Sequence, residues 1–521
     1  MQGFNVSDYF VDRHVREGRG DRVAIRVRGE SITYEELAGR VATAAAALAD
    51  VGVRSEERVL MVLFDGADFV SVFLGAMRLG AVPLPLNPLL PGADLARVAL
   101  ESRARVGAIA AERADVAPIL AAGAPELVEL LVAGDAAAEI SLVRLADVMA
   151  ASSAAPAYDT WEESPGFWLC TSGTTGRAKL VMHRHVDLRL TAEGYAQEVL
   201  AVDPDDRCYS VAPMFHAYGL GNSMGFPLSV GATAVVEPRR PPSPELAASV
   251  LRSERPTLFF AVPTFYAALL ASDLPADTFG STRLAVSAGE PLPAELCAQF
   301  EHRFGVEVLD GIGSTELTHI YISNRAGAVR PGSSGTPVAG YRVRLEDEHG
   351  APVASDTPGQ LVAAGQALAT GYWCRTDATR ERFQGEWLRT GDMYACAADG
   401  FYTYLGRTDD MLKVAGEWVS PAEVEAVLVE HPTVLEAAVV GVPTPDGLTK
   451  PVAMVVAAPG LDPDPAELME HCRSRLAGFK RPRAIFVVDT LPKTAVGKIV
   501  RSNVRELAAA ASARAGQGVT G

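Results

Sequence analysis

The sequence predicts an α/β protein with a large N-terminal domain and a small, mobile α+β C-terminal domain. A chain of 521 residues is too long for one hydrophobic core and should divide into domains. Amphipathic helical segments alternate with short apolar runs over residues 30–150 and again over 180–325. Such alternation is typical of mostly parallel sheets. From about residue 330 the chain is rich in Gly, Pro and short strand-like runs, which indicates a small β-rich subdomain.

The first alternating region predicts one α/β sheet subdomain. Tyr34–Leu48 has the apolar spacing of an amphipathic helix, and Arg58–Phe64 has the composition of a buried strand. A second helix is predicted over Phe69–Gly80, followed by a strand over Val82–Leu86. The Ser/Ala/Pro-rich segment Ala150–Ala157 predicts a linker or exposed loop.

The second alternating region predicts another α/β sheet subdomain. Its strands are expected at Gly231–Glu237, Leu258–Val262 and Leu284–Ala288. The major boundary is placed at Gly406–Asp410. This divides the chain into an N-terminal domain of residues 1–408 and a C-terminal domain of residues 409–521, with a tail that frays after about residue 508 because it is rich in Ala, Gly and Ser.

Composition excludes several classes of protein. A net charge of −17 and a pI of about 5.1 argue against a general binder of nucleic acid or of anionic membranes. The six cysteines are scattered without a CxxC pair, which favours a reducing cytoplasm and excludes a disulfide framework or a zinc site. No apolar run reaches the ~18–20 residues that a membrane span needs.

The segment Thr171–Lys179, Thr-Ser-Gly-Thr-Thr-Gly-Arg-Ala-Lys, predicts a loop that binds phosphate. It follows Gly166–Cys170, which has the composition of a short buried strand. Its glycines turn backbone N–H groups toward an anion, its hydroxyls donate hydrogen bonds, and its lysine supplies a positive charge. The residues concerned are Thr171, Ser172, Gly173, Thr174, Thr175, Gly176 and Lys179. The spacing is not that of the Walker motif.

Four further motifs follow in a fixed order. They are Gly311–Glu316 (Gly-Ile-Gly-Ser-Thr-Glu), Thr390–Asp392, Gly406–Lys413 and Pro492–Lys498. With the phosphate loop, they resemble the ordered core motifs of the adenylate-forming superfamily, which comprises acyl- and aryl-CoA synthetases, peptide-synthetase adenylation domains and luciferases. The likeness extends from about Tyr34 to about Arg501. Within the superfamily the sequence is most similar to benzoate-CoA ligases, through the runs Ala217–Asn222, Phe226–Ala234, Leu309–Glu316, Ser323–Val329 and Asp409–Val414.

The resemblance implies ATP and Mg²⁺ as ligands and CoA as a co-substrate. It assigns the phosphate loop to the β- and γ-phosphates, Thr315 to the α-phosphate and Glu316 to Mg²⁺, an ion that takes few protein oxygens. It assigns Asp392 to the ribose and Arg407 to the ribose or a phosphate. The walls of the adenine pocket would be Ser287, Ala288, Gly289, Glu290, Asp310, Gly311 and Ile312, and Gly313 would also belong to the ATP site.

The resemblance also implies two uses of the C-terminal domain. Lys498 would bridge the substrate carboxylate and the α-phosphate during adenylation, where a cation stabilises the charge that develops on phosphorus. The domain would then rotate about Asp409, the hinge, so that Lys413 and the loop with Gly416 and Glu417 complete a tunnel for CoA.

An acyl pocket is implied at Phe215, His216, Ala217, Tyr218, Gly219, His319 and Ile320. Peptide-synthetase adenylation domains carry Asp after the equivalent Phe, to pair an α-ammonium group. Here His216 follows Phe215, and a buried ammonium without a partner is costly, so an amino-acid substrate is disfavoured. The expected substrate is a benzoate-like aromatic acid, or else a larger apolar acid such as a fatty or terpenoid acid.

Some alternatives stay open. The family loop usually continues Pro-Lys-Gly, whereas this chain has Ala178-Lys179-Leu180, a change that bears on ATP affinity. The acyl group could pass to CoA, to a separate carrier protein or to a partner enzyme, and the protein could be a monomer or a homodimer. A non-catalytic relative is disfavoured because Glu316, Asp392, Arg407 and Lys498 are all present.

Overall fold

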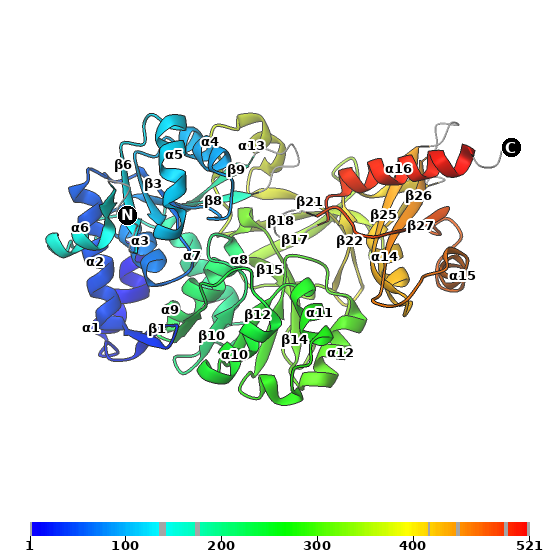
Figure 1. Ribbon diagram of the computed structural model, residues 1–521, viewed down its shortest axis with the longest axis horizontal. Helices are drawn as coiled ribbons and strands as arrows, with labels where there is room; N and C mark the ends of the chain where they lie inside the picture. Colours follow the sequence, from blue (N-terminus) through cyan, green and yellow to red (C-terminus); the bar gives the residue numbers. More distant parts are fainter. Residues whose placement is uncertain are drawn as a thin grey trace. The chain divides into compact units, whose positions relative to one another are not determined.

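The computed structural model describes residues 3–134, 142–171, 178–414, 417–443, 449–493 and 499–517. The chain forms two compact units (Figure 1). Unit 1 comprises Met1–Arg342 and Ala363–Leu388, and unit 2 comprises Val343–Val362 and Arg389–Gly521. The predicted α/β class is confirmed, with two α/β sheets, a β-rich region and a smaller C-terminal α+β region. The domain boundary and hinge at Asp409 stay predictions.

The large sheet of unit 1 has nine strands in the order β16-β15-β14-β13-β12-β10-β11-β1-β2. β10, β12, β13 and β14 pair in parallel, and β14 pairs antiparallel with β15. Helices α10, α11 and α12 pack against one face of these strands through a core that includes Phe259, Tyr266 and Phe300 (Figure 1). The strands are β1 (Val23–Val27), β2 (Glu30–Thr33), β10 (Arg207–Ser210), β11 (Thr233–Val236), β12 (Leu258–Ala261), β13 (Leu284–Ser287), β14 (Val308–Gly313), β15 (Ile320–Ser323) and β16 (Thr336–Pro337).

The second sheet of unit 1 is parallel, in the order β4-β3-β5-β6-β7. Its strands are β3 (Arg58–Val62), β4 (Val82–Pro85), β5 (Val106–Ala110), β6 (Glu129–Ala133) and β7 (Val143–Arg144). Helix α2 begins at Tyr34, as predicted, because the Thr33 hydroxyl accepts a hydrogen bond from the Glu36 N–H and the Glu36 carboxylate accepts one from the Thr33 N–H.

The α-helices of unit 1 are α1 (Arg13–Arg16), α2 (Tyr34–Asp50), α3 (Ala67–Arg78), α4 (Gly92–Ser102), α5 (Ala117–Gly123), α6 (Leu145–Ala151), α7 (His185–Thr191), α8 (Ala217–Leu220), α9 (Phe226–Val230), α10 (Pro244–Glu254), α11 (Pro263–Ala271), α12 (Ala294–Phe304) and α13 (Thr376–Arg382). Short 3-10 or π-helical turns are η1 (Asp8–Asp12), η2 (Ala111–Val116), η3 (Ala192–Gln197), η4 (Gly221–Gly225), η5 (Ala276–Phe279) and η6 (Thr315–Leu317).

A three-stranded antiparallel sheet holds the ends of the predicted phosphate loop. It consists of β8 (Pro165–Thr171), β9 (Lys179–Arg184) and β19 (Gly371–Tyr372), in the order β19-β9-β8. The register pairs Thr171 directly with Lys179. The two residues that bound the loop are therefore fixed opposite each other by the strand pairing.

The predicted β-rich region is a sheet in the order β17-β18-β21-β20, with β22 paired to β21. Its strands are β17 (Tyr341–Glu346), β18 (Gly359–Gly365), β20 (Phe383–Gln384), β21 (Trp387–Cys396) and β22 (Tyr402–Arg407).

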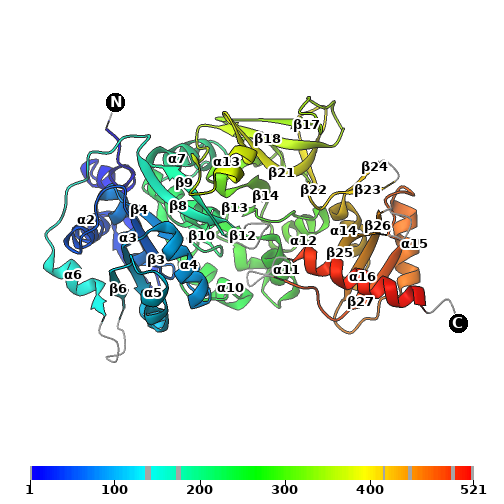
Figure 2. The same cartoon turned by 90° about the horizontal axis from the view of Figure 1, so that it is seen from above.

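The C-terminal part of unit 2 contains a hairpin, a three-stranded sheet and three helices (Figure 2). The hairpin is formed by β23 (Leu412–Val414) and β24 (Glu417–Val419). The sheet is formed by β25 (Val434–Pro443), β26 (Thr449–Ala457) and β27 (Ala484–Val488), and the helices are α14 (Pro421–Val429), α15 (Pro465–Arg475) and α16 (Arg501–Gln517).

The last helix of the chain covers much of the segment in which fraying is expected, and the fraying after about residue 508 stays a prediction. Helix α16 continues to Gln517. Val504 and Ala508, one helical turn apart, are buried against the β25–β26–β27 sheet. Because alanine is the strongest helix former, the Ala-rich composition extends the helix instead of ending it.

Among the residues that the structure describes, no helix combines the length and the apolar character needed to cross a membrane. All six cysteines are free thiols.

Candidate active site

Glu316 lies in the turn η6, which follows directly from strand β14. The Ser314 hydroxyl caps this turn by accepting a hydrogen bond from the Leu317 N–H at 3.2 Å. The Glu316 side chain is buried, with the residue 7% exposed, and its Oε1 accepts a hydrogen bond from the Tyr372 hydroxyl at 2.6 Å. Thr315, predicted to contact the α-phosphate, is half-buried in the same turn.

Tyr372 joins Glu316 to the lysine at the end of the predicted phosphate loop. The Lys179 Nζ lies 5.0 Å from the centroid of the Tyr372 ring, within range of a cation–π interaction. Burial raises the pKa of Tyr372, the Glu316 carboxylate raises it further, and Arg382 opposes them. The phenol therefore keeps its proton at neutral pH and donates a hydrogen bond to the Glu316 carboxylate. The structure thus brings together two predicted ATP-binding residues, Lys179 and Glu316, through a third residue.

Thr318 fixes the chain just after this turn in an unusual conformation. It is a β-branched residue with a φ of 70°, in the left-handed region, which costs about 1–3 kcal/mol. Its hydroxyl donates to the Ala367 carbonyl at 2.8 Å and lies 3.3 Å from Nδ1 of His183. His183 Nδ1 is in turn 3.3 Å from the buried carboxylate of Asp187. Side-chain hydrogen bonds therefore hold the strained backbone in place.

Asp310 and Ser287 are neighbours in register where the parallel pairing of β14 with β13 ends, at the carboxyl end of β13. Burial raises the pKa of Asp310 well above its ordinary value, while the Ser287 hydroxyl and the Gly311 N–H lower it. Its Oδ1 is buried and has no hydrogen-bond partner among the described residues. The carboxyl ends of parallel strands are the usual place for a ligand in an α/β sheet.

The other predicted adenine-pocket residues lie around these two strand ends. Ala288, Gly289 and Glu290 follow β13, and Gly311, Ile312 and Gly313 end β14. Two of the glycines are required by close packing: a Cβ would lie 2.8 Å from the Ile322 carbonyl oxygen at Gly311, and 2.7 Å from the His319 carbonyl oxygen at Gly313. The structure brings this predicted set together.

His319, in the predicted acyl pocket, is 2% exposed and surrounded by aromatic rings. Its ring centroid lies 4.6 Å from that of Phe226 and 5.5 Å from that of Tyr218. Its Nε2 is 3.2 Å from the Tyr218 carbonyl oxygen, an acceptor, so Nε2 carries the proton. Burial lowers the pKa of His319 to about 3, although the bond to Tyr218 acts in the opposite direction, and the ring is neutral at pH 7.

The remaining acyl-pocket residues cluster around α8 and β15. The Tyr218 hydroxyl donates to the Val286 carbonyl at 2.9 Å, and Ala217 and Gly219 are buried beside it. Phe215 is buried with its ring centroid 4.5 Å from that of His216, an exposed residue. Ile320 is buried at the start of β15.

Asp392 and Arg407 face each other in unit 2. They pair in register between β21 and β22, and Arg407 Nη1 donates to Asp392 Oδ1 at 2.8 Å. Burial lowers the pKa of Arg407, but the Asp392 carboxylate outweighs burial and holds it above its ordinary value. Asp392 and Arg407, which belong to separate sequence motifs and lie 15 residues apart, therefore form one ion pair.

The residues predicted for the hinge and the CoA tunnel follow in the same unit. Asp409 is exposed in the turn between β22 and β23. Lys413 is exposed on β23, with its Nζ 5.3 Å from the ring centroid of Trp418 on β24. Glu417 begins β24.

Two family models together match most of the chain. A model of the AMP-binding enzyme family matches residues 11–373, and a model of the AMP-binding enzyme C-terminal domain matches residues 423–498. The chain belongs to the AMP-binding enzyme family. It is 44% identical, over 97% of its length and 95% of the relative, to a 4-hydroxybenzoate–CoA/benzoate–CoA ligase of Rhodopseudomonas palustris.

Two solved structures resemble this AMP-binding enzyme closely. A benzoate CoA ligase from Burkholderia xenovorans LB400 has a TM-score of 0.89 at 41% identity, covering 96% of this chain and 100% of that one. The anthranilate CoA ligase AuaEII in complex with anthranoyl-AMP has a TM-score of 0.92 at 36% identity, covering 98% of each chain.

Several predicted residues of this AMP-binding enzyme lie outside the described residues. They are the loop residues Ser172, Gly173, Thr174, Thr175 and Gly176, together with Gly416 and Lys498. Their roles stay predictions.

Tyr372 is the site residue that sequence reasoning missed. It is separated from Glu316 by 56 residues and belongs to none of the five motifs. The pairing of β19 with β9 brings it to Lys179. No pattern in the sequence signals that pairing, because β19 has only two residues.

The donor set fits a magnesium ion held mainly by substrate. Among the described residues, no three or more His, Cys, Asp or Glu side chains are grouped so that they could hold a metal. Glu316 instead offers a single buried carboxylate. Mg²⁺ is commonly bound by one or two carboxylates together with phosphates and water.

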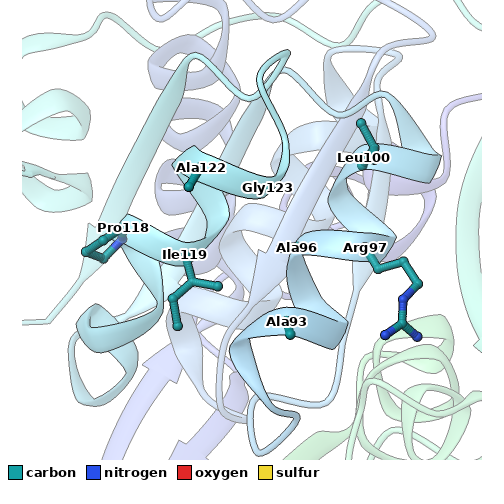
Figure 3. A pocket seen from close by; sticks show the side chains of 8 residues that line it. All are labelled: Ala93, Ala96, Arg97, Leu100, Pro118, Ile119, Ala122 and Gly123. Atoms are coloured by element: carbon teal, nitrogen blue, oxygen red, sulfur yellow. The ribbon is translucent and has the colours of Figure 1, made fainter.

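A shallow groove of about 660 Å³ lies between α4 and α5 of this AMP-binding enzyme (Figure 3). Its lining is Ala93, Ala96, Arg97, Leu100, Pro118, Ile119, Ala122 and Gly123. Its one charged side chain, Arg97, is paired with Asp94 at 2.9 Å. None of the predicted ATP or acyl residues belongs to it.

Proposed function

We propose that this AMP-binding enzyme is an ATP-dependent ligase that joins an aromatic, benzoate-like carboxylic acid to CoA through an acyl-adenylate. The observation that carries the proposal is similarity over nearly the full length, 44% identity, to a relative named for this reaction on benzoate and 4-hydroxybenzoate. A small set of polar residues gathered at the strand ends of unit 1 supports the same conclusion.

In the adenylation step, a carboxylate oxygen of the acid bonds to the α-phosphorus of ATP and the bond to the pyrophosphate oxygen breaks. Lys179 would neutralise charge on the β- and γ-phosphates, and Thr315 would donate to the α-phosphate. Glu316 would hold Mg²⁺, which when bound offsets the negative charge of the phosphates. Asp392, Arg407 and Lys498 keep the roles that the resemblance assigns to them.

In the second step, the sulfur of CoA bonds to the acyl carbon and AMP leaves with the electron pair of the acyl–oxygen bond. Lys413 and the hairpin β23–β24 would line the path of CoA after rotation at Asp409. An exposed side chain on this hairpin is suited to a residue that approaches its substrate only in this step.

The substrate class is inferred from the residues around His319. This neutral imidazole lies among the rings of Tyr218, Phe226 and Tyr195, which favours a planar, apolar ring. Small residues, Ala217 and Gly219, leave space beside them. The pocket residues include no carboxylate to pair an α-ammonium group. The six free cysteines support a cytoplasmic location.

The test is ATP-dependent pyrophosphate release with benzoate, 4-hydroxybenzoate, anthranilate, decanoate and phenylalanine, each with and without CoA. We expect fast turnover with an aromatic acid only when CoA is present, together with the aryl-CoA thioester. If decanoate is the best substrate, the substrate class is fatty acids and not aromatic acids. If phenylalanine is the best substrate, the proposal is contradicted. Pyrophosphate release without any thioester would identify a carrier protein or partner enzyme as acceptor. Glu307→Gln, an acid just before β14, serves as a control that should match the wild type.

A further inference from the structure

Segment 366–373 ties the two phosphate-binding elements of unit 1 together. On one side, the Thr370 N–H donates to the Met182 carbonyl and the Trp373 N–H donates to the Leu180 carbonyl, each at 2.9 Å, so the segment is bound to β9. On the other side, the Ala369 N–H donates to the Glu316 carbonyl at 2.8 Å. The segment therefore sets the distance between β9, which begins at Lys179, and the turn that carries Glu316.

Within the described part of the chain, Tyr372 is the one residue of this segment whose side chain contacts both Glu316 and Lys179. Its hydroxyl donates to Glu316 Oε1 at 2.6 Å, and its ring face lies 5.0 Å from Lys179 Nζ. The residue is only 3% exposed, and its ring packs edge to face with Phe383, with the centroids 5.3 Å apart. This packing leaves the ring little freedom to turn.

We propose that Tyr372 is a positioning residue for ATP and its metal ion. Its hydroxyl donates to Oε1 of Glu316, which would leave the other carboxylate oxygen to hold Mg²⁺, and its ring face contacts the Lys179 ammonium, which would neutralise the polyphosphate. This inference rests on the proposed function, which supplies the metal and the nucleotide. Groups that orient a metal-binding carboxylate typically change metal affinity or activity by about 10–100-fold when they are removed.

The alternative is that Tyr372 only fills the core. A structural tyrosine would lower stability when it is changed but would leave metal dependence as it was. Tyr341 offers a matched control, because its buried hydroxyl also donates to the η6 turn, to the Leu317 carbonyl at 3.0 Å, without touching the Glu316 side chain. Tyr341→Phe and Tyr372→Phe each remove one hydroxyl that contacts the same turn.

Two substitutions separate the two contacts of Tyr372. Tyr372→Phe removes the hydroxyl and keeps the ring face for Lys179. Tyr372→Leu removes both. We expect Tyr372→Phe to weaken Mn²⁺ binding about 10-fold while ATP affinity at saturating metal stays unchanged. Tyr372→Leu should weaken Mn²⁺ binding similarly and also reduce ATP affinity.

The experiment measures Mn²⁺ binding by electron paramagnetic resonance, with the full-length protein and a non-hydrolysable ATP analogue, and the Mg²⁺ concentration for half-maximal pyrophosphate release. A rise of about 10-fold in the Mn²⁺ dissociation constant and in the half-maximal Mg²⁺ concentration for Tyr372→Phe, with no rise in either for Tyr341→Phe, supports the proposal. The proposal would be overturned if Tyr372→Phe bound Mn²⁺ as tightly as the wild type. It would also be overturned if Tyr372→Phe and Tyr341→Phe weakened Mn²⁺ binding equally. If no acid supports pyrophosphate release by the wild type, the proposed function fails, and Mn²⁺ binding still decides the role of Tyr372.

Discussion

The turn that carries Glu316 in unit 1 and the hairpin that carries Lys413 in unit 2 differ in how their functional side chains are held. Glu316 is buried and hydrogen-bonded to Tyr372, and the adjoining Thr318 is fixed by Ala367 and His183. Lys413 is exposed. Its ammonium group lies over the ring of Trp418, which is itself 37% exposed.

The difference follows the order of the two proposed steps. Adenylation requires charges that are already oriented when ATP arrives, because reorganisation of charged groups would add to the barrier. Thioester formation instead requires a group that is brought to the site later. Substitutions in the turn should therefore alter the first step, whereas substitutions on the hairpin should alter only the second.

The largest effect is expected for Glu316→Gln. Glutamine keeps the shape of the side chain and can still accept from Tyr372, but it lacks the charge proposed to bind Mg²⁺. Pyrophosphate release with benzoate should fall about 100-fold or more at fixed Mg²⁺. A loss of less than threefold would mean that Glu316 is not the metal-binding residue.

The next effect is expected for Lys413→Ala on the hairpin. Thioester formation should fall about 10–100-fold, the cost of poor positioning of a reacting group. Single-turnover formation of the adenylate without CoA should be unchanged, and so should the melting temperature, since the side chain is exposed. Arg473→Ala on α15 removes an exposed cation elsewhere in unit 2 and is the control. If Lys413→Ala slowed adenylate formation and thioester formation equally, the proposed difference in function between the turn and the hairpin would be contradicted.

Thr318→Val tests how the turn is held. Valine keeps the β-branched shape at a positive φ but cannot donate to the Ala367 carbonyl. We expect a loss of about 1–3 kcal/mol in the free energy of unfolding, together with weaker Mg²⁺ binding of the kind proposed for Tyr372→Phe. The measurement is thermal unfolding beside the metal titration. Thr43→Val, which removes an exposed hydroxyl bonded within α2, should change neither value. A fully stable Thr318→Val enzyme would show that the hydroxyl does not hold the turn.

The smallest effect concerns pH. Burial lowers the pKa of His185 in unit 1 to about 4, below the 6.5 of an unfolded histidine. Its neutral form is favoured by folding, so its contribution to stability is complete above pH 6.5 and is lost as the pH falls toward 4, by up to about 1.4 kcal/mol per unit. The difference in melting temperature between the wild type and His185→Gln should therefore shrink between pH 7.5 and pH 5.

His471 of unit 2 is the control for this pH effect. Burial also lowers its pKa, but the shift is smaller. His471→Gln should show a smaller change in its difference from the wild type over the same range. A pH-independent difference for His185→Gln would contradict a neutral, buried His185.

The sequence predicted most of the fold because its elements are local. The strand expected at Leu284–Ala288 is β13 (Leu284–Ser287), and the helix expected at Tyr34–Leu48 is α2 (Tyr34–Asp50). Hydrophobic spacing and a capping residue determine such elements. The packing of Val504 and Ala508 against a sheet is not visible in composition, and the fraying expected after about residue 508 stays a prediction.

The candidate site was predictable only as far as its motifs extend. Glu316, Asp392 and Arg407 stand in recognisable runs, but their partners come from tertiary structure. Tyr372 reaches Glu316 across 56 residues, and Thr318 depends on the Ala367 carbonyl, a backbone group that no residue type specifies. Contacts of this kind arise from strand pairing and loop packing between distant segments.

The most direct test of the account is to follow radiolabelled ATP, carrying the label at the α-phosphate, through one turnover with benzoate. Rapid quenching before CoA is added should recover benzoyl-AMP in an amount close to that of the enzyme. Addition of CoA should convert it to benzoyl-CoA and labelled AMP. Labelled ADP as the product, or benzoyl-CoA formed without any benzoyl-AMP, would contradict the account.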